Sequence, residues 1–333
     1  MAVAAVLGGA AWAARGWWLR QRETSLEGQV ALVTGGSRGL GLLLARELTR
    51  EGCTVAICAR DGDELQRAAR LLEAEGRRPL TARCDVGDRD QVHAMVRRIE
   101  RELGPLEVLV NNAGIIQVGP IASMVEDDFR RSLDVMYWGV VNPTLAALPG
   151  MRERGAGRIV NITSIGGKVA VPHLLPYTSA KFAAVGFSEG LRAELQGTGV
   201  TVTTVVPWLM RTGSYLNVEV KGYAQHEFAW FALGASLPLV SMNAERAARR
   251  IVQGARRGEA EVILSLPANL AVRFHGILPG LTSDLMGLVA RVLPASGTTA
   301  ARRGADVDAE SPPWLRAATS LGSAAAARNN ERA

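Results

Sequence analysis

The sequence predicts an α/β protein: one doubly wound (Rossmann) parallel sheet of seven strands with helices on both faces, followed by a C-terminal helical extension. Three observations predict this fold class. Short apolar runs recur between residues 29 and 264, as in strands that are buried on both faces. Stretches with helical periodicity separate these runs, which favours parallel strands joined by crossover helices. A glycine-rich turn joins the first run to the first helical stretch.

Strands and helices alternate along this region. The expected strands cover residues 29–34, 54–59, 79–84, 108–110, 158–163, 200–206 and 261–264. The expected helices cover residues 42–50, 63–75, 88–103, 129–148, 177–196 and 244–257. Ligands of such sheets bind beyond the carboxyl ends of the strands. We therefore expect the residues that follow the strands to form one site.

The sequence divides into four segments. We expect residues 1–24 to be an apolar leader or a membrane anchor, and residues 25–265 to form the Rossmann-fold domain. Residues 266–296 mix apolar stretches with a few charges, which predicts an amphipathic helical extension that contacts a membrane or a partner subunit. Residues 297–333 are rich in Ala, Ser, Gly, Pro and Arg, a composition that predicts a disordered tail.

Composition excludes several classes of function. The net charge of +6 is spread over the chain without a basic block, so we expect no nucleic-acid partner. Cys53, Cys58 and Cys84 lie in apolar runs, which predicts buried free thiols in a reducing compartment. The four histidines lack the spacing of metal ligands, so no metal site is expected.

The leader has two interpretations, and both stay open. Residues 1–19 are apolar apart from Arg15, close to the roughly 20 residues that a spanning helix needs. Arg20 and Arg22 follow, as in an anchor that keeps the bulk of the protein cytoplasmic. The expected location is therefore the cytoplasm, with membrane association through residues 1–22. The alternative is an apolar leader with no membrane role.

The turn after the first strand has the pattern of a phosphate-binding loop. Gly35, Gly39 and Gly41 allow a tight turn and close backbone approach, and the following helix directs its N-terminus at a pyrophosphate. Taken alone, the turn could equally be an ordinary strand–helix connection.

A tyrosine and a lysine four residues apart form the candidate catalytic pair. Tyr177 and Lys181 share one helix face, and a fixed ammonium favours the phenolate of a neighbouring tyrosine. Ser164, thirteen residues before Tyr177, can reach the same reacting oxygen from a loop. The competing interpretation is a half-buried tyrosine beside a solvated lysine. Lysine is rare in this arginine-rich chain, with only three residues, which favours a specific role for Lys181.

Together these motifs resemble the short-chain dehydrogenase/reductase (SDR) family over roughly residues 27–265, and in particular its NADP-preferring ketoreductase and hydroxysteroid-dehydrogenase-like members. The resemblance implies that Tyr177 is the acid–base residue, that Lys181 lowers its pKa and holds the nicotinamide ribose, and that Ser164 binds the substrate oxygen. It also implies an adenine-binding pair, a sheet-stabilising motif (residues 111–114) and a segment that meets the nicotinamide. The implied catalytic residues are Ser164, Tyr177 and Lys181. The implied cofactor-binding residues are Gly35, Ser37, Arg38, Gly39, Leu40, Gly41, Arg60, Asp85, Val86, Asn112, Ala113, Gly114, Tyr177, Lys181, Pro207 and Thr212.

Two positions depart from the family pattern. Trp208 replaces the usual glycine and is expected to reshape the edge of the nicotinamide or substrate site. Met136 replaces an asparagine that holds a water in the family's proton relay, and a thioether is only a weak acceptor. Asn142 lies six residues further along the helix and points away, so it is no substitute.

The expected cofactor is NADP(H), because Arg60 stands where an NAD-preferring member carries an acidic residue and Arg38 lies nearby. Residues 213–243, which in this family close over the substrate, are rich in aromatic side chains. They favour a small lipophilic carbonyl or alcohol substrate, unless they only pack the lid itself. We expect a homo-oligomeric oxidoreductase that interconverts a carbonyl and a secondary alcohol. The alternative is a dinucleotide-binding sensor or scaffold with little turnover.

Overall fold

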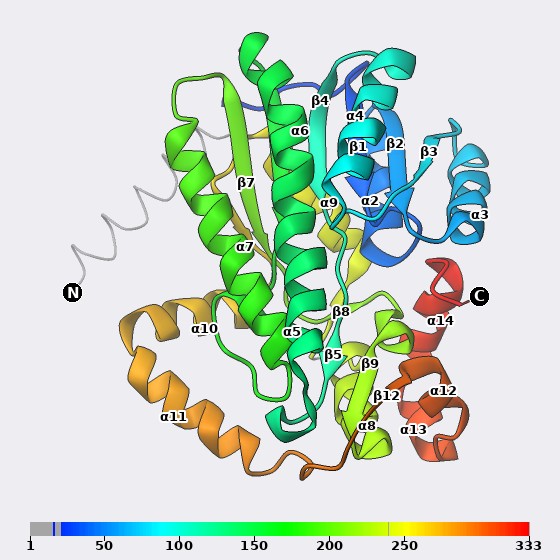
Figure 1. The fold of residues 1–333 in the computed structure, drawn as a ribbon, viewed down its shortest axis with the longest axis vertical. Coiled ribbons are helices and arrows are strands. Elements are labelled where there is room, and N and C mark those ends of the chain that lie inside the picture. Colours follow the sequence, from blue (N-terminus) through cyan, green and yellow to red (C-terminus); the bar gives the residue numbers. More distant parts are fainter. Residues whose placement is uncertain (1–15, 17–20, 239, 333) are drawn as a thin grey trace.

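The fold is known from a computed structural model that describes residue 16, residues 21–238 and residues 240–332. Its centre is a parallel seven-stranded sheet in the order β3-β2-β1-β4-β6-β7-β11 (Figure 1). These strands are β1 (Val30–Thr34), β2 (Thr54–Ala59), β3 (Leu80–Arg83), β4 (Leu106–Asn111), β6 (Gly157–Ile162), β7 (Val200–Val206) and β11 (Glu261–Ile263). The predicted Rossmann fold is confirmed, because each of the apolar runs forms one strand of this sheet.

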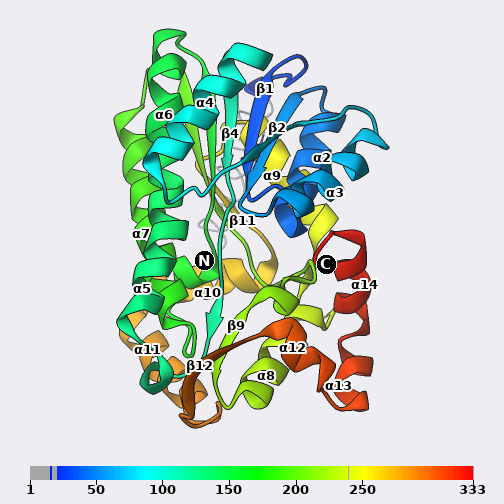
Figure 2. The same cartoon turned by 45° about the vertical axis from the view of Figure 1, so that its right-hand side comes forward.

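Helices cover both faces of the sheet, as Figures 1 and 2 show. One face packs against α2 (Gly39–Arg50), α3 (Gly62–Glu73) and α9 (Ala244–Arg256). The other face packs against α4 (Arg89–Leu103), α6 (Gly139–Glu153) and α7 (Leu175–Glu194). The cysteines are free and buried in these two cores, as predicted.

The helix expected at residues 129–148 differs from the prediction. It consists of α5 (Glu126–Leu133), a π-helical turn over Asp134–Trp138 and then α6. A π turn inserts one residue into the helical ladder, and such turns are frequent at functional sites. Met136 lies in this turn with a fully buried side chain.

A smaller layer lies beyond the carboxyl ends of the strands. Its three-stranded sheet has the order β12-β9-β5, in which β12 is antiparallel to β9. The strands of this sheet are β5 (Gln117–Val118), β9 (Glu219–Gly222) and β12 (Thr298–Arg303). A separate two-stranded sheet pairs β8 (Met210–Arg211) with β10 (Met242–Asn243). The layer also contains α8 (Ala224–Ser236) and 3₁₀ turns at Ile121–Ser123, Ile165–Gly167 and Ser214–Asn217. A third apolar core, separate from those on the two faces of the main sheet, holds this layer together.

The prediction of disorder at residues 297–333 is wrong for the part that the structure describes. After β12 the chain forms α12 (Gly304–Ala309), α13 (Pro313–Ala318) and α14 (Ser320–Arg328), which lie against α8 (Figure 2). Small side chains make this contact close: a Cβ atom on Gly322, in α14, would lie 2.3 Å from Oγ of Ser236, in α8. Val307 and Leu315 are buried in the third core. The segment is ordered because close packing of small residues compensates for its low hydrophobicity.

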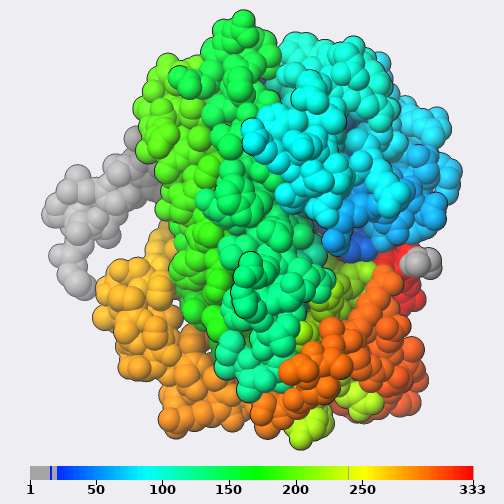
Figure 3. All heavy atoms as spheres, in the orientation of Figure 1, coloured from blue at the N-terminus to red at the C-terminus, as the bar shows by residue number. Residues whose placement is uncertain are grey.

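The expected amphipathic extension contains two helices, α10 (Leu266–Ile277) and α11 (Pro279–Ala290), which form an arm at the edge of the molecule (Figure 3, orange). Many of their large apolar side chains are exposed, among them Leu270, Ile277 and Leu288. Within the described part of the chain, no helix is both long and apolar enough to span a bilayer. The predicted anchor lies almost entirely outside the described residues.

Candidate active site

The glycine turn after β1 has close contacts that only glycine allows. A Cβ atom on Gly41 would lie 2.0 Å from the carbonyl oxygen of Gly35. Gly35 has a φ of 62° and its Cβ position lies 2.8 Å from Cα of Ala113, in the loop after β4. The turn is therefore packed tightly against a neighbouring strand end, and helix α2 begins directly after it. This arrangement suits a bound phosphate group.

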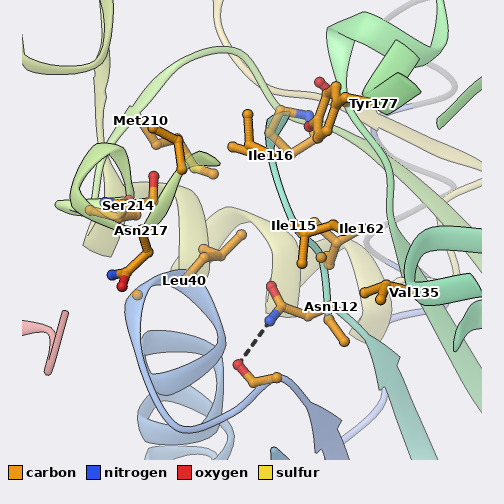
Figure 4. A pocket seen from close by; sticks show the side chains of 18 of the residues that line it. Leu40, Asn112, Ile115, Ile116, Val135, Ile162, Tyr177, Met210, Ser214 and Asn217 are labelled. Carbon is orange, nitrogen blue, oxygen red and sulfur yellow. Dashed lines mark hydrogen bonds between the residues drawn. The ribbon is translucent and has the colours of Figure 1, made fainter. Parts of the chain in front are cut away.

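Two hydrogen-bonded loops form the floor of the site. Thr34 is buried, and its Oγ1 accepts hydrogen bonds from the amides of Asn112 (2.9 Å) and Ala113 (3.2 Å). Asn112 Nδ2 donates to the carbonyl oxygens of Thr34 (3.0 Å) and Gly35 (3.2 Å); Figure 4 shows Asn112 in this position. The chain thus fixes the ends of β1 and β4 relative to each other with side chains that the sequence singles out.

A buried polar chain extends this connection through the sheet. Asn111 Nδ2 donates to Asn161 Oδ1 at 2.9 Å, and Asn161 Nδ2 donates to Ser188 Oγ at 2.9 Å. Ser188 Oγ lies 2.7 Å from Thr204 Oγ1. Strands β4, β6 and β7 and helix α7 are therefore joined at one level, which fits the sheet-stabilising role that the resemblance implies for residues 111–114.

The catalytic candidates lie at the end of β6 and in the first turns of α7. Ser164 caps the 3₁₀ turn that follows β6, and its Oγ accepts a hydrogen bond from the amide of Gly166 at 3.0 Å. Lys181 is buried, and its Nζ donates to the carbonyl oxygen of Ile162 at 2.8 Å. The same Nζ lies 5.8 Å from the centroid of the Tyr177 ring. The structure therefore brings the three candidates together, and Lys181 is not a surface lysine.

Burial controls the protonation of this pair. It raises the pKa of Tyr177 above its ordinary value, and a hydrogen bond with Ser164 opposes this rise. Burial also lowers the pKa of Lys181 to about 8. The direction for Tyr177 is opposite to the one expected from the spacing, because the loss of water around the phenol outweighs the hydrogen bond with Ser164.

The residues of the predicted site line one cavity of about 910 Å³. Every catalytic or cofactor-binding candidate named from the sequence lines it, from the glycine turn through Arg60, Asp85 and Asn112 to the catalytic set. Figure 4 shows Tyr177 and Asn217 on opposite sides of the cavity, with Leu40 on the same side as Asn217. We refer to the part around Tyr177 as the catalytic end and to the part around Arg38 and Arg60 as the phosphate end.

The aromatic side chains of residues 213–243, the lid, were expected either to line the substrate site or to pack the lid itself, and the structure shows both. Tyr215 and Phe228 are fully buried in the third core, so they pack the lid itself. Trp230 and Phe231 line the cavity. Trp208 also lines it and donates from Nε1 to the carbonyl oxygen of Val240 at 2.7 Å.

A buried glutamate that sequence reasoning missed positions part of the lid. Glu227 accepts a hydrogen bond from Trp230 Nε1 at 2.7 Å, and its other oxygen lies 2.7 Å from His173 Nδ1. Burial raises the pKa of Glu227. Nothing in the local sequence identifies this contact, because His173 and Glu227 lie on different elements.

Met136 and Asn142 lie as the helix geometry requires. A Cβ atom on Gly114 would be 3.7 Å from Met136 Sδ, so the thioether fills the space beneath that loop. Asn142 Nδ2 donates to the carbonyl oxygens of Val86 (3.0 Å) and Gly87 (3.2 Å). Asn142 therefore holds the turn after β3 and is occupied there.

The C-terminal residues are the largest surprise at the site. Glu331 lines the same cavity, together with Asn217 and Arg303. Arg38, predicted to bind a cofactor phosphate, instead contacts two carboxylates: Glu64 at 2.6 Å and Glu331 at 3.5 Å. No sequence signal places residue 331 beside residue 38, since the tail lacks any motif.

A doubly wound sheet, a glycine turn at its first strand end and a Ser–Tyr–Lys set in one cavity define a dinucleotide-binding oxidoreductase fold. Comparison with known proteins identifies the family. The profile of the short chain dehydrogenases matches residues 29–219. The chain belongs to this family and is an SDR oxidoreductase.

Relatives and solved structures agree with this assignment. A Mycobacterium tuberculosis protein that bears the name oxidoreductase SadH is 38% identical over 248 residues, which cover 74% of this chain and 89% of SadH. The structure of a tryptophan-substituted variant of actinorhodin polyketide ketoreductase with NADPH is 30% identical, with a TM-score of 0.62 over 73% of this chain and 97% of that one. A metagenomic short-chain oxidoreductase in complex with NADP is 33% identical, with a TM-score of 0.53 over 57% of this chain and 86% of that one.

Proposed function

We propose that the chain is an NADP(H)-dependent oxidoreductase that interconverts a carbonyl and a secondary alcohol in a lipophilic substrate. The observation that carries this proposal is the single cavity with a glycine turn at one end and Ser164, Tyr177 and Lys181 at the other. A dinucleotide is long enough to lie between such ends, with its reacting ring beside the tyrosine.

The residues fit a dinucleotide of this kind. Gly35 and Gly41 keep the turn tight, because a Cβ atom at either position would collide with the backbone of Ala113 or Gly35, and a tight glycine turn before a helix suits a pyrophosphate. At the phosphate end, Arg60 supplies a guanidinium for a 2′-phosphate, and no carboxylate of the described residues lies within ion-pair distance of it. The neighbouring structures named with NADPH and NADP support the choice of cofactor.

The chain's own residues would manage the proton. When bound, the cofactor supplies or accepts the hydride. Tyr177 donates its phenolic proton to the substrate oxygen in reduction and takes it back in oxidation. Ser164 holds that oxygen by a hydrogen bond, which stabilises the charge that develops on it. Lys181, fixed by the carbonyl oxygen of Ile162, keeps a positive charge near the phenol while its amine is protonated.

The catalytic end suits a lipophilic substrate. Its lining includes Val171, Leu174, Trp230, Phe231 and Met286, which come from the catalytic loop, the lid and the helical arm. Apolar walls with a few convergent polar groups are typical of small-molecule sites. A polar substrate would leave most of its hydroxyl groups without partners on these walls.

The proton that Tyr177 donates must be replaced by a route that differs from the family's relay. Met136 replaces the asparagine of the family pattern and is fully buried, so it cannot fix a water by hydrogen bonds. Main-chain carbonyl groups can hold a water when enough of them converge. We infer that they do so here, with weaker resupply as the consequence.

The proposal also includes two kinds of contact, with other copies of the chain and with a membrane. We expect a homo-oligomer, and we expect membrane contact through residues 1–22 or the arm formed by α10 and α11. The exposed Leu270, Ile277 and Leu288 on that arm support an apolar contact. Light scattering on the purified chain measures its oligomeric state, and a version beginning at Glu23 tests the leader by cell fractionation. If both versions are equally soluble, the leader has no membrane role.

A cofactor-consumption assay tests the central proposal. The purified chain should oxidise NADPH in the presence of apolar ketones and should reduce NADP⁺ with the matching alcohols. The alternative of a sensor or scaffold finds its support in Met136. Tight NADPH binding without turnover on a broad panel of ketones would favour that alternative.

A further inference from the structure

The three residues Asn329, Asn330 and Glu331, which we call the C-terminal strap, cross the phosphate end of the cavity directly after α14. Figures 1 and 2 show α14 below α3, the helix that follows β2. We propose that Glu331 determines cofactor affinity: its carboxylate occupies the phosphate end, and the strap must be displaced when the cofactor phosphates bind. This inference rests on the proposed use of NADP(H).

The strap uses the backbone groups of the glycine turn. The amide of Gly39, at the first position of α2, donates to the carbonyl oxygen of Asn329 at 2.8 Å. The first amides of a helix have no partner within the helix and serve as anion donors. One such donor is therefore already occupied by the chain itself.

Asn330 holds the strap against the turn. Its Nδ2 donates to the carbonyl oxygens of Ser37 (2.8 Å) and Glu64 (3.1 Å), and its Oδ1 accepts from Arg67 Nε (3.1 Å). Asn330 has a φ of 56°, a conformation that asparagine tolerates better than most residues. These contacts make a specific docked state and are inconsistent with a chance crossing of a loose end.

Glu331 lies where a phosphate would meet the turn. A Cβ atom on Gly39 would be 2.3 Å from Glu331 Oε1, so the carboxylate touches the glycine that the sequence assigns to the cofactor. Its Oε2 accepts from Asn217 Nδ2 at 2.7 Å and lies 3.5 Å from Arg38 Nε. Only 4% of the side chain is exposed. The carboxylate thus takes the cation and the position that an incoming phosphate needs.

The docked carboxylate is imperfectly neutralised. Arg38 and Arg303 attract it, whereas Glu64 repels it and also binds Arg38 at 2.6 Å. Burial raises the pKa of Glu331 to about 7. A buried carboxylate with such partners is held less firmly than one in a close ion pair, so a phosphate with more charge can displace it. A phosphate and an ionised Glu331 cannot share this space without strong repulsion.

Binding measurements on matched variants test the proposal. Glu331→Gln keeps the shape of the side chain and removes its charge, and a chain ending at Arg328 removes the strap. Glu310→Gln is the control, because Glu310 lies on the same extension but pairs with Arg302 away from the cavity. Titration with NADPH should give a Kd roughly 10-fold lower or better for Glu331→Gln, with the control unchanged. A chain ending at Arg328 that remains folded should bind at least as tightly.

Hydrogen exchange provides a second readout that is independent of turnover. In the unaltered chain, NADPH should speed exchange in a peptide covering residues 320–332, because the strap leaves its contacts. Slower exchange, or weaker or unchanged binding by Glu331→Gln, would overturn the proposal and leave the strap as a clamp or a spectator. If the unaltered chain binds neither NADPH nor NADH, the proposed function fails as well. If it binds and oxidises NADPH while Glu331→Gln binds no more tightly, only the strap proposal fails.

Discussion

The catalytic end and the phosphate end of the cavity differ in the charges that they contain. Among the described residues near Tyr177, the catalytic end contains the buried cation Lys181, which is held by a main-chain carbonyl, and apolar side chains such as Leu174 and Phe231. At the phosphate end Arg38 contacts both Glu64 and Glu331, and Arg303 lies near Glu331. The catalytic end therefore fixes a proton donor, whereas the phosphate end balances charges that can be exchanged.

This difference predicts which substitutions change the rate of the reaction and which change the binding of the cofactor. Changes at the catalytic end should alter kcat more than cofactor affinity, because the charged phosphates of the proposed cofactor would bind at the other end. Changes at the phosphate end should alter the Kd or KM for the cofactor and its preference between NADPH and NADH. The following predictions are ordered by the size of the expected effect.

Removing the Tyr177 hydroxyl should have the largest effect. Tyr177→Phe deletes the proton donor but keeps the ring, so we expect a loss of roughly 10²–10⁴-fold or more in kcat. NADPH binding, measured by fluorescence titration, should persist with little change. Near-normal turnover by a pure, folded variant would show that another group moves the proton.

Removing the Arg60 guanidinium should affect the other end alone. A charged hydrogen bond contributes about 1.5–3 kcal/mol, so Arg60→Ala should reduce the preference for NADPH over NADH by roughly 10–100-fold in kcat/KM. The kcat at saturating NADPH should change little. An unchanged preference would mean that the 2′-phosphate contacts other residues.

The pH profile of carbonyl reduction should report Lys181. Its pKa of about 8 means that the ammonium is present below that pH and is lost above it. Tyr177 keeps its proton throughout, since burial raises its pKa. The reduction rate should be flat below about pH 8 and decline by up to about tenfold per pH unit above it. A flat profile to pH 10 would separate the charge of Lys181 from catalysis.

Unfolding does not account for such a decline. Lys181 has a pKa of about 8 in the folded chain against its ordinary 10.5. Between these values the unfolded chain binds the extra proton, so this group makes the fold more stable as the pH rises. Thermal unfolding measured at each pH provides the check.

Much of this molecule could be predicted from its sequence, and the exceptions have physical causes. Apolar runs such as 200–206 locate the strands because burial on both faces demands them. The candidate site follows, because parallel strands bring Asp85, Asn112 and Ser164 to one edge. Contacts made by the C-terminal extension could not be predicted, since small residues such as Ala326 carry no signal until their partner surface is known.

Burial also changed the pKa shift that the local sequence predicted for the tyrosine. The spacing of Tyr177 and Lys181 is evident in the sequence, but the degree to which water is excluded from them is not. The pKa of Tyr177 therefore moves upward in the structure. The π turn at Asp134–Trp138 has no sequence signature of its own either, and it places Met136 beneath Gly114.

Met136→Asn should have the smallest effect. Restoring an amide behind Lys181 offers a water one further partner, so kcat should rise modestly or stay unchanged. If proton resupply limits the rate, the solvent isotope effect should fall in the variant. A large loss of activity at normal stability would show that Met136 shapes the pocket, since its side chain already fills the space under Gly114.

Isotope transfer tests the central claim most directly. NADPH in which both hydrogens of the reacting nicotinamide carbon are replaced by deuterium is mixed with the full chain and an accepted ketone, and the alcohol is analysed by mass spectrometry. If the cavity joins a cofactor at the glycine turn to a substrate at Tyr177, the deuterium should appear on the carbinol carbon of the product. An alcohol product without the label would contradict hydride transfer within this cavity.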